Sequence, residues 1–281
     1  MDTVIRSKTK ETIIGPERPT AIIGERINPT GKKRLAAALA DKDMSRVEAL
    51  ARSQIADGAT ILDVNVGAAG VDEVELLPMA VKAVSAITDL PLCLDSANAK
   101  ALRAGLDVYE GKALINSVNG EEASLERVLP LVKEYGAAVI GLTMDDDGIP
   151  PTVEKRVAIA AKIVERAEAL GIPREDVLID CLALSVCTDA SAGQTTLGAI
   201  RGVRETLGLN MTLGASNISF GLPDREAINA TFLAMAIAAG VNAPIVNPRY
   251  ARGSILIADL LLGRDDFAMT YVSYYRQCQS K

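Results

Sequence analysis

Short apolar runs that end in a polar residue alternate along this chain with longer stretches of helical periodicity. A run of four to seven apolar residues of this kind is typical of a buried strand, and apolar residues at a spacing of three or four are typical of an amphipathic helix. The predicted strands are 20–26, 61–67, 92–95, 113–117, 137–143, 176–182, 210–217 and 242–248. The predicted helices are 31–43, 44–59, 72–88, 98–109, 125–136, 151–171, 194–208, 225–240, 253–263 and 265–279.

The stretch 92–120 shows the repeating unit most clearly. LCLD and ALINS are apolar runs that end in polar residues, and NAKALRAGLDVY lies between them with helical spacing. About twenty residues separate the two strands, which fits a βαβ crossover between parallel strands. Eight strands alternating with helices predict a (β/α)₈ TIM barrel in the α/β class.

Domain organisation follows from the same pattern. Residues 20–281 are expected to form one barrel domain, and residues 1–19 a lead-in segment with one short strand, 11–18, that plugs the bottom of the barrel. The alternative is a doubly wound open sheet, which carries a glycine-rich turn after its first strand. Here that position reads GERINPTG, which lacks the GxGxxG spacing.

Composition narrows the class further. The chain has 281 residues, 49% of them hydrophobic and only 3% aromatic, so Ala, Val, Ile and Leu must form the core. No apolar run approaches the roughly 20 residues of a membrane span, and MDTVIRSKTKETIIG is not a secretory signal. We therefore expect a cytoplasmic protein, and a net charge of −6 gives no nucleic-acid footprint.

The absence of histidine limits the chemistry. It excludes Ser-His-Asp and Cys-His nucleophile arrangements and imidazole-based zinc centres. Cys93, Cys181, Cys187 and Cys278 form no close ligand pairs, so buried reduced thiols are expected rather than a metal site. Acid–base work falls to carboxylates, Lys, Tyr or the substrate, and we expect no metal bound by this chain.

The polar strand ends are the candidate site. In a barrel they converge on the carboxyl face, where catalytic groups of this fold lie. A single Asp or Asn there is often only the N-cap of the next helix, an alternative that is open for Asp95 and Asn116. Asp63, Asp95 and Asp180 would also bring like charges together, which a ligand rich in N–H donors offsets. The strand ends are Glu25, Asp63, Asn65, Asp95, Asn116, Thr143, Asp180, Ser216, Asn217 and Asn247.

Carboxylates and amides without basic residues suit a neutral heterocycle with adjacent N–H groups, and a pterin has such an edge. A phosphate ligand would require a glycine-rich nest or several Arg and Lys residues. The exception is NPRYARGS near the end of the chain. Its Arg249 and Arg252 could hold an anionic tail, or could flank a helix capped by Ser254.

Several motifs in combination resemble one family over residues 20–265. They are GERINPTG, DVNVG, LCLDSAN, LINSVN, GLTMDDDGIP, the Asp180 strand, GASNIS and INATFLAMAIAAG. In this order they are similar to the pterin-binding methyltransferases, which include methyltetrahydrofolate:corrinoid protein methyltransferases, the folate domain of cobalamin-dependent methionine synthase and the tetrahydrofolate methyltransferases of demethylation systems. The resemblance implies a (β/α)₈ barrel that is commonly a homodimer.

The resemblance also implies roles for single residues. Asp95, Asn116 and Asp180 would bind the pterin edge, Asn217 would lie near the reactive N5, and Gly214 and Ser216 would line the pocket. The remaining candidates in the matching motifs are Glu25, Asn28, Asp63, Asn65 and Ser219. Arg225 matches an Arg of the family or is only a first-turn helix residue, and Arg249 is a candidate from NPRYARGS rather than from a matching motif. The chain departs from some relatives in having Cys181 instead of Pro after the strand-six Asp, and Phe220 instead of Gln.

The implied reaction moves a methyl group between N5 of tetrahydrofolate and the cobalt of a corrinoid (methylcobalamin) carried by a separate protein. Similarity to demethylation-system members favours the methylcorrinoid protein as donor; transfer from methyltetrahydrofolate to a corrinoid iron–sulfur protein is the alternative direction. Dihydropteroate synthase shares a pterin barrel but has a diphosphate-binding Ser-Arg pair near its last strands, where this chain has GASNIS and NPRYARGS. A non-catalytic folate-binding protein is the third alternative.

Overall fold

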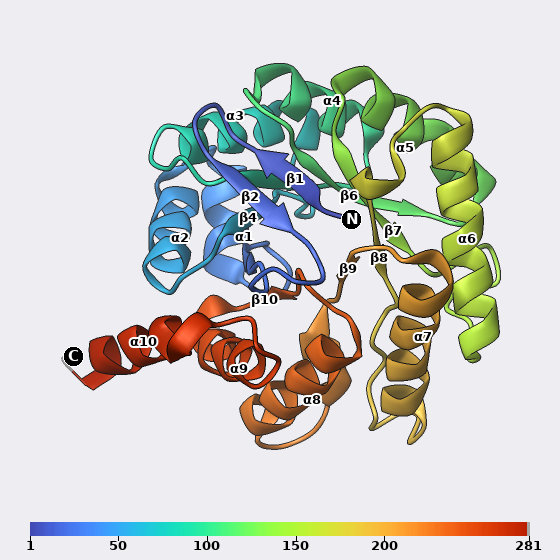
Figure 1. The fold of residues 1–281 in the computed structure, drawn as a ribbon. Coiled ribbons are helices and arrows are strands. Elements are labelled where there is room, and N and C mark those ends of the chain that lie inside the picture. Colours follow the sequence, from blue (N-terminus) through green and yellow to red (C-terminus); the bar gives the residue numbers. More distant parts are fainter. Residues whose placement is uncertain (280–281) are drawn as a thin grey trace.

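Eight parallel strands form a barrel ringed by helices (Figure 1). This computed structural model describes residues 1–279. The sheet order β10-β3-β4-β5-β6-β7-β8-β9 is closed by a parallel bridge between Gly214 and Ile245. The (β/α)₈ prediction is therefore confirmed. The barrel strands are β3 (Ile23–Ile27), β4 (Ile61–Asn65), β5 (Leu92–Asp95), β6 (Leu114–Asn119), β7 (Ala138–Leu142), β8 (Val177–Asp180), β9 (Met211–Thr212) and β10 (Ile245–Val246).

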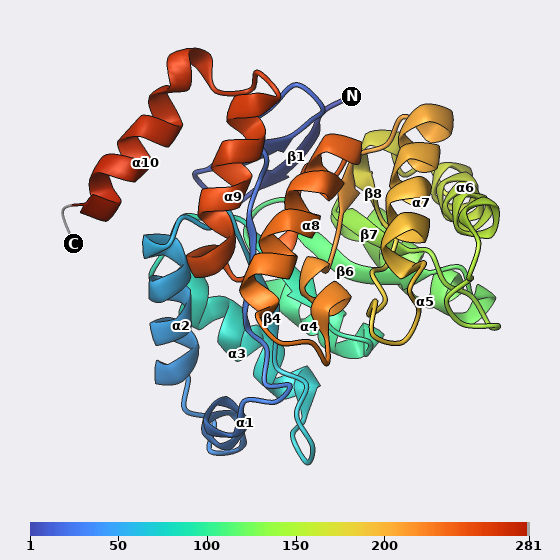
Figure 2. The ribbon, with the colours of Figure 1, turned by 90° about the horizontal axis from the view of Figure 1, so that it is seen from below.

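Helices follow each strand and cover the outside of the barrel, where their apolar faces pack on the buried strands. The last helix, α10, stands away from the barrel beside α9 (Figure 2). The helices are α1 (Lys33–Ala40), α2 (Ser45–Ala56), α3 (Glu73–Ser85), α4 (Ala99–Val108), α5 (Glu122–Tyr135), α6 (Val153–Ala169), α7 (Ala192–Leu207), α8 (Arg225–Ala239), α9 (Pro248–Leu261) and α10 (Met269–Gln279), with short 3₁₀ turns η1 (Arg174–Asp176), η2 (Ala215–Ser219) and η3 (Asp266–Ala268).

A β-hairpin closes the amino end of the barrel. β1 (Thr3–Arg6) and β2 (Glu11–Ile14) pair antiparallel and cross that opening (Figure 1). Ile5 and Ile14 are fully buried in a cluster formed largely by residues from the first halves of the barrel strands. A strand at this end of the barrel was expected, but the prediction of only one was wrong, because TVIR at residues 3–6 supplies a second that pairs with it.

Five predicted strands end earlier than expected, namely those at 61–67, 137–143, 176–182, 210–217 and 242–248, and the corrections to the last two affect the site. β9 stops at Thr212, and residues 215–219 form the 3₁₀ turn η2 instead of continuing the strand to 217. β10 stops at Val246, and Asn247 caps α9 with Pro248 in its first turn. Ser254 therefore lies inside α9 and is not its cap.

The prediction that the cysteines are buried, reduced thiols is confirmed for two of the four. All four thiols are free, but only Cys93 and Cys181 are buried, whereas Cys187 and Cys278 are exposed. Among the helices of residues 1–279, none combines the length and apolar character that a membrane crossing requires.

Candidate functional site

Polar side chains on three neighbouring strands lie level with one another at the carboxyl end of the barrel. The strand register pairs Asn65 with Asp95, and Asp95 with Asn116. The Asn65 amide donates a 2.9 Å hydrogen bond to Oδ2 of Asp95, and its own Oδ1 accepts from the Gly67 backbone N–H at 2.8 Å. Because both ends of the Asn65 amide are engaged, it orients the Asp95 carboxylate.

Asp63 supports Asn116 from the barrel interior. The Asn116 amide donates to Asp63 Oδ1 at 3.4 Å, and the Cys93 thiol hydrogen-bonds the same carboxyl group. Neither Asp95 nor Asn116 caps a helix, because Asn98 caps α4 and Glu121 is the N-cap residue of α5. The capping alternative is wrong for both residues, which leaves their side chains available to a ligand.

Asp95 and Asn116 line one hollow at the mouth of the barrel, with a volume of about 320 Å³. Its lining is mostly polar and comes from the ends of β5, β6 and β7 and from α5. The lining residues are Asp95, Ser96, Ala97, Asn116, Ser117, Asn119, Glu121, Ser124, Arg127, Val128 and Leu142. We call this the polar hollow. It brings together two of the three predicted pterin ligands; Asp180 lies two strands beyond β6, at the end of β8.

Asp180 is buried and holds two backbone segments together. Its Oδ1 accepts from the Leu182 N–H at 2.7 Å, and its Oδ2 accepts from the Gly214 N–H at 3.1 Å. Burial raises the pKa of Asp180 to about 6, against the opposing effect of these two N–H donors. The next residue, Cys181, is buried, and its backbone carbonyl accepts from the buried Arg156 guanidinium at 2.7 Å.

Burial also raises the pKa values of two other acidic residues at the site, Asp63 and Asp95. It raises the pKa of Asp63 well above its usual range, and the neighbouring Asp95 carboxylate raises it further. Burial raises the pKa of Asp95 to about 6, while the Asn65 hydrogen bond opposes the shift. Asp95, with a pKa of about 6, is mostly ionised at neutral pH, and the raised pKa of Asp63 favours the neutral form of that carboxyl group, which reduces the expected clustering of three negative charges.

Asn217 lies on η2 and is exposed at the mouth of the barrel. A clamp formed by Arg225 fixes this turn: Nε donates to Ser219 Oγ at 3.0 Å, and Nη2 donates to the Ser216 carbonyl at 2.8 Å. The guanidinium also lies over the Phe220 ring, 5.8 Å from its centroid. Arg225 thus positions the turn that carries Asn217, beyond its place in the first turn of α8.

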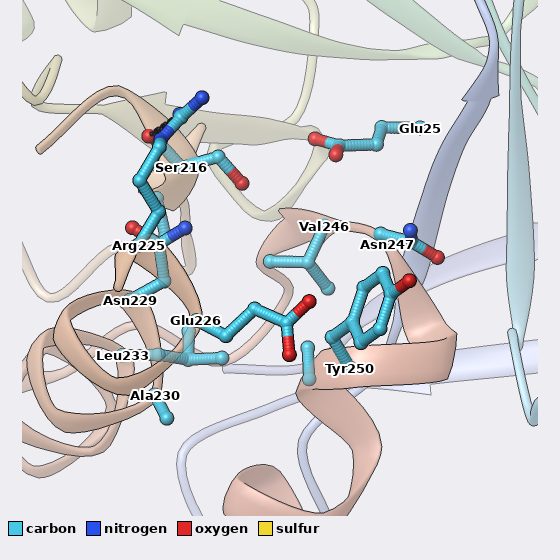
Figure 3. Close-up of a pocket in the computed structure, with 12 residues that line it drawn as sticks. Glu25, Ser216, Arg225, Glu226, Asn229, Ala230, Leu233, Val246, Asn247 and Tyr250 are labelled. Atoms are coloured by element: carbon cyan, nitrogen blue, oxygen red, sulfur yellow. Dashed lines mark hydrogen bonds between the residues drawn. The ribbon is translucent and has the colours of Figure 1, made fainter. Parts of the chain in front are cut away.

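A second hollow of about 250 Å³ lies beside this turn, and we call it the mouth hollow (Figure 3). Figure 3 shows Arg225 and Asn229 on α8 facing Asn247 and Tyr250 across it. Burial raises the pKa of Glu25, which lines the same hollow, against the effect of Lys32, Arg26 and Arg225. The lining residues are Glu25, Ala215, Ser216, Arg225, Glu226, Asn229, Ala230, Leu233, Val246, Asn247, Tyr250 and Ala251.

Some predicted site residues lie elsewhere, and some lining residues were missed. Asn28 Oδ1 accepts from the Thr30 N–H at 2.9 Å in a local turn and lines neither hollow. Arg249 is exposed near the start of α9, outside both hollows. The sequence analysis did not predict Glu226, Asn229 and Tyr250 as lining residues. The spacing of Glu226, Ala230 and Leu233 places them on one face of α8, and this spacing was the signal available in the sequence.

The described residues, 1–279, contain no group of three or more His, Cys, Asp or Glu side chains placed to hold a metal ion. Carboxylates and amides around the two hollows offer hydrogen-bond acceptors and donors. Such groups can bind a polar heterocycle and orient it.

Comparison with known proteins identifies the class. Residues 24–247 match the family described as pterin binding enzyme. The chain also has the fold of a Yersinia pestis dihydropteroate synthase (DHPS) solved with a pterine-sulfa conjugate, with a TM-score of 0.69 and 16% identity over 94% of this chain and 99% of that one. The chain belongs to the family of pterin-binding enzymes.

Similarity to two curated relatives identifies the enzyme class of the chain within this family. It is 33% identical to the methylcorrinoid:tetrahydrofolate methyltransferase of Eubacterium limosum over 264 residues, covering 91% of this chain and 96% of that protein. It is 34% identical to the methionine synthase of Mycobacterium leprae over 82% of this chain, and the match covers 20% of that protein. Within the family, the chain is a methyltransferase.

Proposed function

We propose that this methyltransferase moves a methyl group from a methylcorrinoid, carried by a separate protein, to N5 of tetrahydrofolate. The proposal is supported most by one observation: Asp95 and Asn116 lie level on adjacent strands and line one hollow, each backed by a β4 side chain. An ionised carboxylate beside an amide complements the donors and acceptors of a pterin edge.

The two methyl-transfer partners need holding rather than covalent activation. Positioning two reactants in an attack geometry contributes several kcal/mol to lowering a bimolecular barrier, on the order of 7–11 in the best cases. In this direction the N5 lone pair bonds to the methyl carbon, the carbon–cobalt bond breaks with its electron pair left on cobalt, and N5 then releases its proton to water. The Asn217 amide can donate to or accept from N5, so one residue serves N5 before and after transfer.

The direction is favoured by the relative from Eubacterium limosum, whose name gives methylcorrinoid as donor and which matches along 96% of its length. Transfer from methyltetrahydrofolate to a corrinoid iron–sulfur protein uses the same residues. Dihydropteroate synthases share the fold at 16–19% identity, and this likeness concerns the fold alone.

A methyl-transfer assay tests the proposal. The purified protein is mixed with tetrahydrofolate and either methylcobalamin or candidate methylcorrinoid proteins, and methyltetrahydrofolate is measured by chromatography. We expect product, with one corrinoid protein supporting the fastest turnover. Saturable tetrahydrofolate binding without product from any methylcorrinoid would show a binding protein and overturn the proposal.

We further propose that the protein acts as a cytoplasmic homodimer. Exposed apolar side chains gather on the last elements of the chain, where Leu261, Phe267 and Met269 are 79%, 97% and 69% exposed. Such a patch on a soluble protein favours association. Light scattering at micromolar concentration tests the dimer: a monomer mass would contradict it.

A further inference from the structure

Arg156, near the start of α6, has the largest fully buried side chain among residues 1–279, and it is only 1% exposed. Its Nη1 donates to the carbonyls of Cys181 and Leu182, both at 2.7 Å, and its Nε donates to the Pro150 carbonyl at 2.8 Å. The guanidinium therefore ties the loop after β7 to the loop after β8. A buried cation held by carbonyls instead of a carboxylate is costly, and an apolar side chain could serve stability as well.

Leu182, two residues after Asp180, has a left-handed backbone conformation with a φ of +57°. A leucine is strained in this conformation, and it persists only where surrounding contacts enforce it. Such contacts exist at both ends of the residue. The Leu182 N–H donates to Asp180 Oδ1 at 2.7 Å, and its carbonyl accepts from Arg156 at 2.7 Å and from the Thr196 hydroxyl at 3.1 Å. Asp180 and Arg156 thus hold opposite ends of one strained residue.

This arrangement links the buried guanidinium to the orientation of the Asp180 carboxylate. One carboxylate oxygen is fixed by the Leu182 N–H, and the other accepts from the Gly214 N–H at 3.1 Å. Without Arg156 on its carbonyl, Leu182 is expected to relax to a right-handed or extended conformation, which turns its N–H away from the carboxylate. Asp180 would then be fixed at one oxygen only and could rotate.

The charge of Arg156 acts on Asp180 as well. It lowers the pKa of that carboxyl group and so opposes the effect of burial. The residues paired with Asp180 on β7 and β9 are uncharged. The other ionisable groups that face the guanidinium are the buried Cys181 thiol and the exposed Asp189 carboxylate. Arg156 therefore favours the ionised form of Asp180, which can accept from N–H donors.

We propose that Arg156 is a positioning residue for tetrahydrofolate binding, which acts through Leu182 to hold the Asp180 carboxylate in the orientation that accepts from the pterin. The proposal rests on the proposed function, because it takes Asp180 as a ligand of tetrahydrofolate. Arg156 itself is buried and needs no contact with the substrate.

A double-mutant cycle separates positioning from a purely structural role. R156K keeps the charge but replaces the planar fork with a single ammonium group, and T196V removes the hydroxyl that donates to the Leu182 carbonyl. We expect each to weaken tetrahydrofolate binding, by about tenfold for R156K and about threefold for T196V, in calorimetry. In a D180A background, where no carboxylate remains to be positioned, the same changes should alter Kd by less than about twofold.

The pH dependence supplies a second readout. Wild-type affinity is expected to fall as pH drops through about 6, the pKa of Asp95 and Asp180. R156Q removes the charge that favours ionised Asp180, so its affinity should begin to fall at a higher pH. R156K and T196V keep the charge and should keep the wild-type pH dependence. R166Q, which removes a surface cation from the same helix, is the matched control and should bind and titrate as the wild type does.

The possible failures are distinguishable. If the wild type binds tetrahydrofolate and R156K and T196V, folded by circular dichroism, bind it equally well, the positioning proposal fails and the proposed function stands. The same holds if their losses are as large in D180A as in the wild type, or if R156Q keeps the wild-type pH dependence. If R156Q does not fold, the cycles with R156K and T196V decide by themselves. If the wild type neither binds nor turns over tetrahydrofolate, both proposals fail.

Discussion

The Asn65 amide donates a 2.9 Å hydrogen bond to the Asp95 carboxylate from the adjacent strand, at the same level of the barrel. The bond joins Asn65, which is not among the residues that line the hollow, to Asp95, which is. A carboxylate held in this way presents its other oxygen to a ligand without the entropy cost of ordering it on binding. Asn65 therefore positions the Asp95 carboxylate, and we propose that it does so for pterin binding.

Replacing Asn65 with Ala should weaken tetrahydrofolate binding about tenfold, because a charge-assisted hydrogen bond that fixes the Asp95 carboxylate is lost. Calorimetry on the purified variant measures this. N98A, which removes the cap of the neighbouring α4, is the control: it should cost about 1 kcal/mol of stability without the loss of affinity. Wild-type affinity in N65A would remove Asn65 from the site.

The pKa values of Asp95 and Asp180, both about 6, set the pH dependence of binding. Each carboxyl group must be ionised to accept from pterin N–H groups, so affinity should be constant above about pH 7 and fall as pH drops through about 6. With both groups titrating, log Kd should rise by up to about two units per pH unit below that range. D180N should bind more weakly throughout and show a shallower dependence. A pH-independent Kd between about 5 and 7 would contradict the assignment.

The raised pKa of Asp63 leads to a different expectation for that residue. Because burial favours the neutral form of Asp63, the isosteric change D63N is expected to preserve the acceptor for Asn116 at little cost. Its free energy of unfolding at pH 7 should lie within about 1 kcal/mol of the wild type, whereas D63A should lose about 1–3 kcal/mol, since it leaves a cavity and an unsatisfied amide. Urea unfolding monitored by circular dichroism compares the two. Equal losses would indicate an ionised Asp63.

Substitution of Asn217 tests the proposed role of this residue in methyl transfer. Asn217 is exposed at the mouth of the barrel on a turn that the Arg225 clamp fixes, so N217A should leave that turn and the polar hollow intact. We expect kcat to fall by about 10²-fold or more, in the range of other positioned acid–base groups, with the Kd for tetrahydrofolate changed only severalfold. Steady-state kinetics with calorimetry separate the two. Equal losses in kcat and affinity would make Asn217 a binding contact alone.

The barrel and its polar mouth were predictable from the sequence because each signal was local. LCLD and ALINS have the length and apolar character of parallel strands, and their terminal Asp95 and Asn116 fall at the carboxyl face by topology alone. The sequence could not decide whether Asp95 caps a helix or faces a ligand, because the answer depends on contacts outside the local sequence. The structure shows that Asn98 caps α4 and that Asp95 accepts a hydrogen bond from Asn65.

Other features depended on contacts between distant segments. β1 has no partner until it pairs with β2 and seats Ile5 under the barrel, so the sequence predicted one strand of the hairpin and missed the other. Just beyond the end of β9 at Thr212, the Gly214 N–H donates to Asp180, about thirty residues earlier in the chain. The clamp of Arg225 on Ser219 and Ser216 likewise needed the folded turn η2.

The central claim is that Asp95, Asn116 and Asp180 hold the pterin of tetrahydrofolate at the carboxyl mouth of the barrel. A crystal structure of the protein soaked with tetrahydrofolate tests it most directly. The account predicts the pterin ring within hydrogen-bond distance of all three side chains, with N5 beside Asn217. A ring bound anywhere else, or one that leaves Asp95 and Asn116 without a contact, would contradict it.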